Sequence, residues 1–338
     1  MKKSWIAKSL VFTAVSTLIL SGCAAQSSGT GKLNVVTTFY PMYEFTKQVA
    51  GEHADVIALI PAGAEPHDWE PSAKDMKKVS DADVFVFNGI VEGWAEQALA
   101  SAGNSKRVVV EASQGIALME GLPEEEEEHK EEHKDEHKDE HKDEHKDEHK
   151  DEHKDEHKES ADGKILDPHV WLSPALAQKE VESIVAGLTQ ADPAHKADYR
   201  KNADVFIAKL KALDESFRTG LNNVKQKDFV TQHAAFGYLA KEYGLTQVPI
   251  AGLSPEEEPS PAKMAEIIDF AKKNQVKTIF FETLVDPKVA QTISKEINAK
   301  TDVLNPLEGL TDEDKKQNLD YIAIMTKNLE ALKKALNE

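Results

Sequence analysis

Short apolar runs alternate along the first part of the chain with longer amphipathic segments. The runs are rich in Val, Ile and Phe and are bounded by turn residues, which predicts buried strands. They lie at residues 33–37, 55–60, 84–87 and 108–110. Segments with the apolar spacing of helices separate them, at residues 43–50, 72–80 and 92–100. Because strands alternate with helices, the pattern predicts a parallel sheet covered by helices.

The same alternation returns in the last third of the chain. Strands are predicted at residues 228–231, 247–250, 278–281 and 302–304. Helices are predicted at residues 235–243, 261–274, 287–298 and 312–336. The chain therefore belongs to the α/β class, with two lobes that each contain a parallel-type sheet and flanking helices.

A different kind of segment separates the two lobes. Residues 175–188 have a helical pattern, and Asp192-Pro193 then supplies an N-cap acid and a proline suited to a first helical turn. Because neither glycine nor another proline follows before residue 219, one helix of about 40 Å is predicted. Its apolar stripe is expected to be Val205, Leu210, Leu213 and Phe217. A rigid helix of that length acts as a spacer between the lobes.

The N-terminus predicts export and a lipid anchor. Lysines flank the uncharged residues 9–22, a stretch too short to span a bilayer, as in a signal peptide. The stretch ends in Leu20-Ser21-Gly22-Cys23, which resembles the bacterial lipobox and contains the only cysteine of the chain. That resemblance implies cleavage after residue 22 and lipidation of Cys23; an ordinary secretory signal with an incidental cysteine is the alternative. Residues 23–31 then form a flexible tether.

Residues 124–159 form a low-complexity insert without any apolar side chain. The insert contains 20 acidic side chains and 8 lysines, so it accounts for −12 of the net charge of −19. Such a segment cannot bury a core and is expected to be disordered without metal. One histidine recurs every fourth residue, at His129, His133, His137, His141, His145, His149, His153 and His157. These histidines are candidate auxiliary, low-affinity metal ligands, because imidazoles at i and i+4 share one helix face. A merely solvated acidic insert is the alternative.

Five histidines lie outside the insert. His53 and His195 have polar neighbours and are interpreted as surface residues. His67 and His233 follow predicted strands, and His169 follows the insert. Since ligands bind beyond the carboxyl ends of parallel strands, these three are predicted to converge between the lobes as a metal site. A single histidine near a strand end is more often structural, so the prediction depends on the set.

Two acids share this placement at predicted strand ends. Glu282 follows the strand at 278–281, and Glu308 lies in the loop after the strand at 302–304.

The acidic balance of the whole chain argues against a nucleic-acid partner, which needs a basic surface.

Four loops carry a resemblance to a known family. They are Gly63-Ala64-Glu65-Pro66-His67-Asp68-Trp69-Glu70-Pro71, Asp167-Pro168-His169-Val170-Trp171-Leu172, His233-Ala234-Ala235-Phe236-Gly237-Tyr238-Leu239 and residues 252–261. They resemble the motifs of cluster A-I solute-binding proteins, the ZnuA-like and AdcA-like zinc lipoproteins of bacterial ABC importers. The resemblance runs from about Leu33 to the C-terminus. It implies two α/β lobes bridged by one long helix, with metal bound between them and a histidine-rich insert.

The resemblance also implies a ligand set. It places the metal ligands on His67, His169 and His233, with Glu308 as the fourth; some relatives use water there, and Glu282 is the competing carboxylate. Three imidazoles and one carboxylate suit Zn²⁺. Manganese-type relatives have a carboxylate at the position of His233.

The implied function is metal capture and not catalysis. The chain is expected to be an extracytoplasmic zinc-binding lipoprotein, held on the cell membrane through Cys23, that delivers Zn²⁺ as a monomer to an ABC permease and its ATPase. A lipoprotein for manganese or another divalent metal, or a surface adhesin, is the alternative. A zinc hydrolase is disfavoured because the chain has neither a His-Glu-x-x-His helix nor a nucleophile motif. The expected domains are a signal peptide (1–22), the tether (23–31), an N-terminal lobe (32–173), a linker helix region (174–224) and a C-terminal lobe (225–338).

Overall fold

Four parallel strands form the sheet of the first lobe, in the order β2-β1-β3-β4. In the computed structural model, which describes residues 31–121 and 165–338, they are β1 (Leu33–Thr37), β2 (Ala54–Ala58), β3 (Val84–Phe87) and β4 (Val108–Glu111). All four residues of β3 are buried because helices cover both faces of the sheet. On one face, α1 (Tyr40–Ala50) and α4 (Pro174–Ala191) cover Val84 and Val86. On the other, α2 (Ala73–Asp81) and α3 (Ala95–Ser101) cover Phe85 and Phe87.

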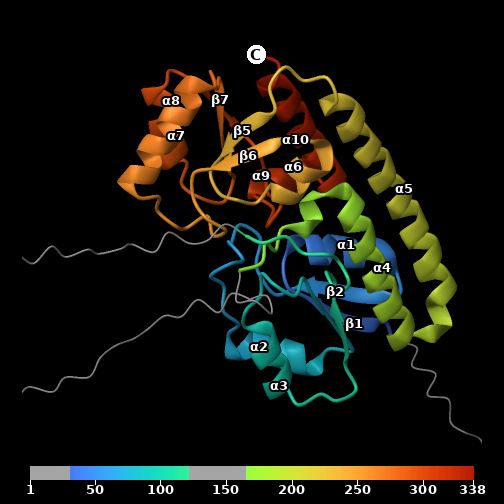
Figure 1. The fold of residues 1–338 in the computed structure, drawn as a ribbon. Helices are drawn as coiled ribbons and strands as arrows, with labels where there is room; N and C mark the ends of the chain where they lie inside the picture. The colour runs from blue at the N-terminus through green and yellow to red at the C-terminus, as the bar shows by residue number, and fades with distance from the viewer. Residues whose placement is uncertain (1–30, 122–164) are drawn as a thin grey trace, which may run out of the picture. The chain divides into compact units, whose positions relative to one another are not determined.

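The second lobe repeats this topology. Its parallel strands, in the order β6-β5-β7-β8, are β5 (Asp228–Thr231), β6 (Thr246–Pro249), β7 (Thr278–Phe281) and β8 (Lys300–Val303). Helices α7 (Pro261–Lys273) and α8 (Lys288–Glu296) pack on one face. Helices α6 (Gly237–Tyr243) and α10 (Tyr321–Ala335) lie towards the other (Figure 1). The two-lobed α/β fold expected from the sequence is confirmed.

Helix α5 (Lys196–Leu221) runs along both lobes (Figure 1). It follows the short 3₁₀ turn η2 (Pro193–His195), packs on α1 and α4 of the first lobe, and packs on α6 and α10 of the second. Its 26 residues span about 39 Å. Its buried side chains recur every three or four positions, at Tyr199, Ala203, Phe206, Ile207, Leu210, Leu213, Phe217 and Leu221. One continuous apolar core therefore reaches from the first sheet to the second.

The predicted apolar stripe of this helix is wrong at one position. Val205 is 57% exposed, and its neighbours Phe206 and Ile207 are buried instead. At 100° per residue, Phe206 lies in line with Leu210 and Leu213, whereas Val205 turns to solvent.

Several helix boundaries also differ from the prediction, as where α1 begins at Tyr40 and not at Tyr43, and two of the differences have a clear local cause. The helix expected over residues 312–336 is divided into α9 (Asp312–Lys316) and α10, which begins at Tyr321. Asn318 adopts φ +51°, and the Asp320 side chain caps the new helix by accepting the backbone N–H of Ala323. Helix α3 begins at Ala95 and not at Glu92, because the Glu92 carboxylate accepts backbone hydrogen bonds from Asn88 and Gly89.

Residues Lys32–Glu338 group into one unit. In the described ranges, no helix combines the length and apolar character needed to cross a bilayer. The predicted signal peptide, Cys23, and the 124–159 insert with its eight histidines lie outside the described residues.

Candidate metal centre

His67 lies in the loop between β2 and α2. The backbone N–H of Ala64 donates to the Pro61 carbonyl at 3.1 Å, which closes a turn before the histidine. The backbone N–H of His67 itself donates to Glu65 Oε2 at 2.8 Å. The loop ends at Ser72, whose hydroxyl begins α2 with a capping box. Local hydrogen bonds thus hold this histidine without burying it completely.

His169 lies just before the 3₁₀ turn η1 (Val170–Leu172) and is fully buried. Asp167 Oδ1 accepts from its backbone N–H at 2.9 Å and lies 2.8 Å from its ring Nδ1. The next turn is attached to the second lobe, because Trp171 Nε1 donates to the Pro306 carbonyl at 2.8 Å and the Tyr321 hydroxyl donates to the Trp171 carbonyl at 2.5 Å. Since Nδ1 donates to the carboxylate, Nε2 is free to face the centre.

His233 follows β5, and Glu282 follows the neighbouring strand β7. Glu282 Oε1 lies 2.5 Å from His233 Nδ1 and 3.2 Å from its backbone nitrogen. The acid considered as a competing fourth ligand therefore sits behind a histidine and fixes its ring. It is not part of the converging group.

Glu308 follows β8 and is 2% exposed. The preceding Leu307 has φ +60°, an unfavourable conformation for a branched side chain. Asn305 holds this turn: its side chain accepts from Leu307 N–H at 2.7 Å, and its own N–H donates to Asn328 at 2.9 Å. The strained turn directs the Glu308 carboxylate towards the histidines.

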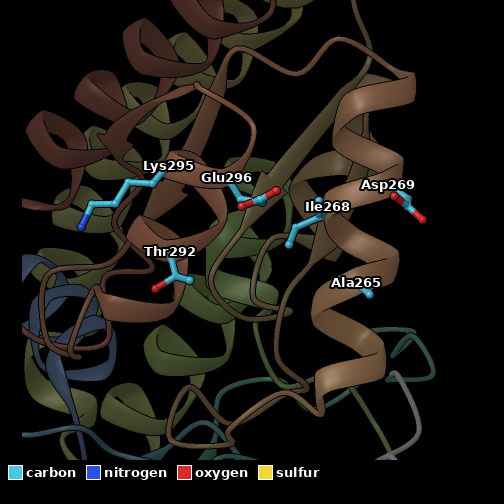
Figure 2. A pocket seen from close by; sticks show the side chains of 6 residues that line it. All are labelled: Ala265, Ile268, Asp269, Thr292, Lys295 and Glu296. Carbon is cyan, nitrogen blue, oxygen red and sulfur yellow. The ribbon is translucent and has the colours of Figure 1, made fainter.

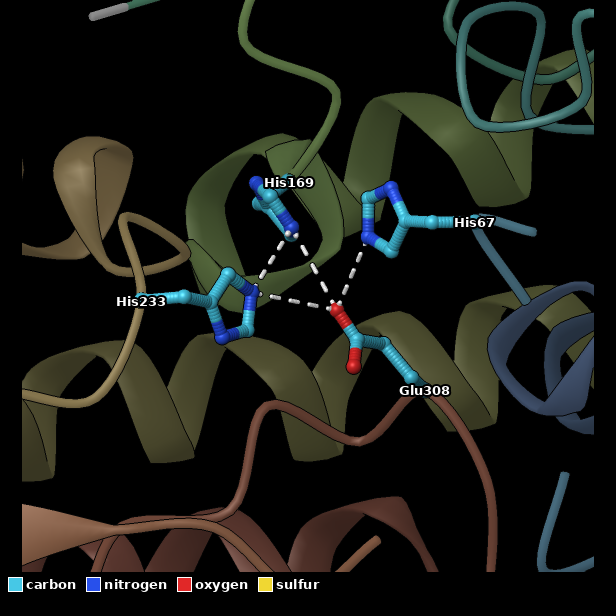
Figure 3. Close-up of side chains that lie close together, drawn as sticks. All are labelled: His67, His169, His233 and Glu308. Atoms are coloured by element: carbon cyan, nitrogen blue, oxygen red, sulfur yellow. Dashed lines mark hydrogen bonds and ion pairs between the residues drawn. The ribbon is translucent and has the colours of Figure 1, made fainter. Parts of the chain in front are cut away.

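The four side chains meet at one point, although they come from loops far apart in sequence (Figure 3). Glu308 Oε1 lies 3.2 Å from His67 Nε2, 3.3 Å from His169 Nε2 and 3.4 Å from His233 Nε2. The Nε2 atoms of His169 and His233 are 3.4 Å apart. In the described part of the chain, this is the one group of at least three His, Cys, Asp or Glu side chains spaced to hold a metal ion.

Charge is concentrated in this buried cluster. Burial alone would lower the pKa of His233, but the Glu282 and Glu308 carboxylates hold it well above its ordinary value. Burial alone would raise the pKa of Glu308, but the three histidines, His233 foremost, hold it well below its usual range. Burial raises the pKa of Glu65 to about 7. Without a cation, the cluster thus favours a protonated His233 beside an ionised Glu308, and a bound cation would displace that proton.

The remaining histidines of the described residues lie elsewhere. His53 and His195 stack on each other, with ring centroids 4.0 Å apart, and each pairs with its own aspartate, Asp198 and Asp192. A separate surface pocket of about 500 Å³ lies between α7 and α8, lined by Ala265, Ile268, Asp269, Thr292, Lys295 and Glu296 (Figure 2). Its lining contains neither histidine nor cysteine, so it does not resemble a transition-metal site.

Two acidic residues near the site were not singled out from the sequence. Asp167 and Glu65 each stand two residues before a site histidine, with a proline between. The repeated acid-Pro-His spacing was the available signal, because a carboxylate two residues earlier can accept the backbone N–H of the histidine.

The comparison with known proteins decides the family. Residues 35–335 match the family described as "Zinc-uptake complex component A periplasmic". The chain belongs to this family. The resemblance seen in the four loops is thereby confirmed, and the description of the family is that of an uptake component and not of an enzyme.

Relatives of this chain include proteins named for zinc. It is 48% identical to the high-affinity zinc uptake system protein ZnuA of Bacillus subtilis, over 99% of both chains. It is 45% identical to the zinc-binding lipoprotein AdcA of Streptococcus pneumoniae, over 98% of this chain but only 61% of AdcA. The crystal structure of the Zn(II)-bound ZnuA-like domain of that AdcA covers 91% of this chain and all of the domain, with a TM-score of 0.71.

A further solved structure connects this fold with a second activity. It is the laminin-binding protein Lmb of Streptococcus agalactiae, described as a bifunctional protein with adhesin and metal transporting activity. It is 36% identical, covers 90% of this chain and 99% of its own, and has a TM-score of 0.73.

Proposed function

We propose that this chain binds Zn²⁺ outside the cytoplasmic membrane and delivers it to the permease and ATPase of an ABC importer. His67, His169, His233 and Glu308 are the proposed ligands. The names of the relatives and the donor set of the site support the same metal.

One geometric observation carries the proposal. A tetrahedral zinc ion with ligands at 2.0–2.1 Å needs donor atoms about 3.3 Å apart. The separations between Glu308 Oε1 and the three Nε2 atoms are 3.2, 3.3 and 3.4 Å, and that between His169 and His233 is 3.4 Å. These four separations already match, and all four donor atoms lie within 4.8 Å of one another, so binding of zinc needs limited rearrangement and ordering the ligands costs little free energy.

The same closed ligand set argues against catalysis and against manganese. A catalytic zinc ion keeps one position open for water or substrate, whereas four protein ligands fill this site. Manganese favours oxygen ligands over imidazoles, and three of the four donors here are imidazole nitrogens. Adhesion is a second candidate function because the related Lmb combines it with metal transport.

The test of the proposal is a zinc titration of the whole protein. We expect one tight zinc ion in the site and a looser set on residues 124–159, because that insert must lose chain entropy to enclose metal. Deleting residues 124–159 should abolish the loose set and leave the tight one, as measured by calorimetry and metal analysis. Loss of the tight zinc in the deletion would place the primary receptor in the insert.

Cells that lack the whole protein should fail to grow only when zinc is chelated. Normal growth of these cells in the presence of the chelator would exclude an essential role in import.

A second prediction concerns the membrane anchor. The Cys23→Ser variant should leave the membrane fraction, because no thiol remains to carry the lipid. Its soluble part should still bind one tight zinc ion, since the proposed ligands lie elsewhere. Fractionation followed by immunoblotting measures the release, and an unchanged membrane-bound fraction would exclude the lipoprotein assignment.

A further inference from the structure

Glu65 is a carboxylate beside the site that does not belong to the four-residue group. Its Oε2 accepts the backbone N–H of His67 at 2.8 Å. Its Oε1 is buried and has no hydrogen-bond partner among the described residues. That oxygen lies 3.9 Å from His67 Nε2, the nitrogen that faces Glu308. A buried carboxylate oxygen without a hydrogen-bond partner, this close to a metal-facing nitrogen, is a donor atom that a cation can use.

Asp167 shows what the same motif does with a shorter side chain. Both acids stand two residues before a histidine and accept its backbone N–H. Asp167 also lies 2.8 Å from Nδ1 of His169, the ring nitrogen that faces away from the site. Glu65 is one methylene longer, and its free oxygen lies instead near the metal-facing nitrogen of His67. Asp167 therefore orients a ring, whereas Glu65 offers an additional donor atom on the metal side.

Glu65 also lies towards the accessible side of the site. The side chains of Glu65 and His67 are 10% and 5% exposed. Those of His169 and His233 are completely buried, and that of Glu308 is 2% exposed. A cation arriving from water therefore meets Glu65 and His67 before it reaches the deeper ligands.

We propose that Glu65 is a transient zinc ligand. Its Oε1 and His67 Nε2 bind the arriving ion first, and the ion then exchanges the Glu65 oxygen for the donors of His169, His233 and Glu308. Release follows the same steps in reverse. Each step exchanges one ligand for another, water included, with no change in the oxidation state of zinc. This inference rests on the proposed zinc-binding function.

A transient ligand has a kinetic signature that a permanent ligand lacks. Since it stabilises only the path between free and bound states, its removal slows association and dissociation by the same factor and leaves the Kd unchanged. Removing a permanent ligand, or damaging the fold of the site, instead speeds dissociation and weakens the Kd. The two rate constants measured together therefore distinguish the two roles.

The experiment uses stopped-flow fluorescence of the full chain with excess Zn²⁺, and a chelator chase for dissociation. The signal is intrinsic tryptophan fluorescence, because the ring of Trp171 lies 5.2 Å from that of His169 and the 124–159 insert contains no tryptophan. Glu65→Gln keeps an acceptor for the His67 N–H but loses the carboxylate. Its association and dissociation rate constants for zinc should both fall on the order of tenfold, with an unchanged Kd. Glu65→Asp keeps the charge but loses the reach, so it should be slowed similarly. Glu70→Gln, which removes an exposed charge from the same loop, should behave as the wild type.

Three results for the Glu65 variants would overturn the inference. The first is wild-type rate constants for zinc association and dissociation in Glu65→Gln, and the second is faster dissociation with a weaker Kd in that variant. The third is wild-type rate constants in Glu65→Asp. Equal slowing by Glu70→Gln would show that general electrostatic attraction is responsible and would also overturn it. If the wild-type protein bound no tight zinc, the proposed function itself would fail, and this result is separate from all the others.

Discussion

Replacing His169 or His233 with alanine is expected to weaken the tight zinc site by roughly 10²–10³-fold. Either change leaves three ligands, and it also leaves a buried carboxylate, Asp167 or Glu282, without its imidazole partner. His67→Ala should have a similar effect through loss of its ligand. Calorimetry on the 124–159 deletion measures the change without interference from the insert.

Matched variants separate loss of a ligand from general damage. His53→Ala removes an imidazole that stacks on His195 away from the site, so zinc affinity should stay at the wild-type value. Glu308→Ala should weaken binding less than the histidine variants, because water can take the fourth position. Wild-type affinity in any of the three histidine variants would remove that residue from the proposed ligand set.

The second large effect concerns the pH dependence of folding. Glu180 of α4 is completely buried, its Oε1 lies 3.4 Å from Asn88 Nδ2, and its Oε2 has no hydrogen-bond partner among the described residues. Burial, with a smaller contribution from the Glu92 carboxylate, raises the pKa of Glu180 to about 8. The folded protein therefore holds a proton that the unfolded chain releases at much lower pH.

Proton linkage gives the direction in which Glu180 changes the stability of the fold with pH. Because the folded pKa exceeds the unfolded one, the contribution of Glu180 to stability is complete below about pH 4.5. As the pH rises to about 8 this contribution is lost, and the free energy of unfolding falls by on the order of 4 kcal/mol. Glu180→Gln should remove this slope and make the variant more stable than the wild type at pH 8. Urea unfolding of zinc-free protein at pH 5, 6.5 and 8 measures the difference.

The control for this prediction lies on the same helix. Glu182 is exposed and pairs with Arg200 at 2.5 Å, so Glu182→Gln should change the free energy of unfolding by less than about 1 kcal/mol. Since Glu180 remains in this variant, its stability should depend on pH as that of the wild type does. Parallel pH curves for Glu180→Gln and the wild type would show that Glu180 is ionised in the folded protein.

The order of strands and helices could be predicted from the sequence because it depends on local periodicity. Apolar runs of three to six residues between helical segments predicted both sheets, and the absence of proline and glycine after Pro193 predicted α5. The predicted boundaries were wrong where a distant or backbone contact overrode the local pattern. One example is α3, which begins only at Ala95 because Glu92 accepts the backbone N–H groups of Asn88 and Gly89.

The candidate site divides in the same way. The sequence alone singled out His67 and His233, because each follows a predicted strand and ligands bind beyond the carboxyl ends of parallel strands. His169 lies before a 3₁₀ turn instead, and it was singled out as the third member of the set. Placement at strand ends did not separate Glu282 from Glu308, since both follow strands of the same sheet, and the family resemblance alone favoured Glu308. Only the tertiary structure shows where each carboxylate lies, through contacts between residues distant in sequence. Glu282 reaches Nδ1 of His233, while Asn305 and Asn328 fix the strained turn at Leu307 that directs Glu308 to the three Nε2 atoms. Periodicity determines which face a residue occupies, but the packing of the two lobes determines which atoms meet.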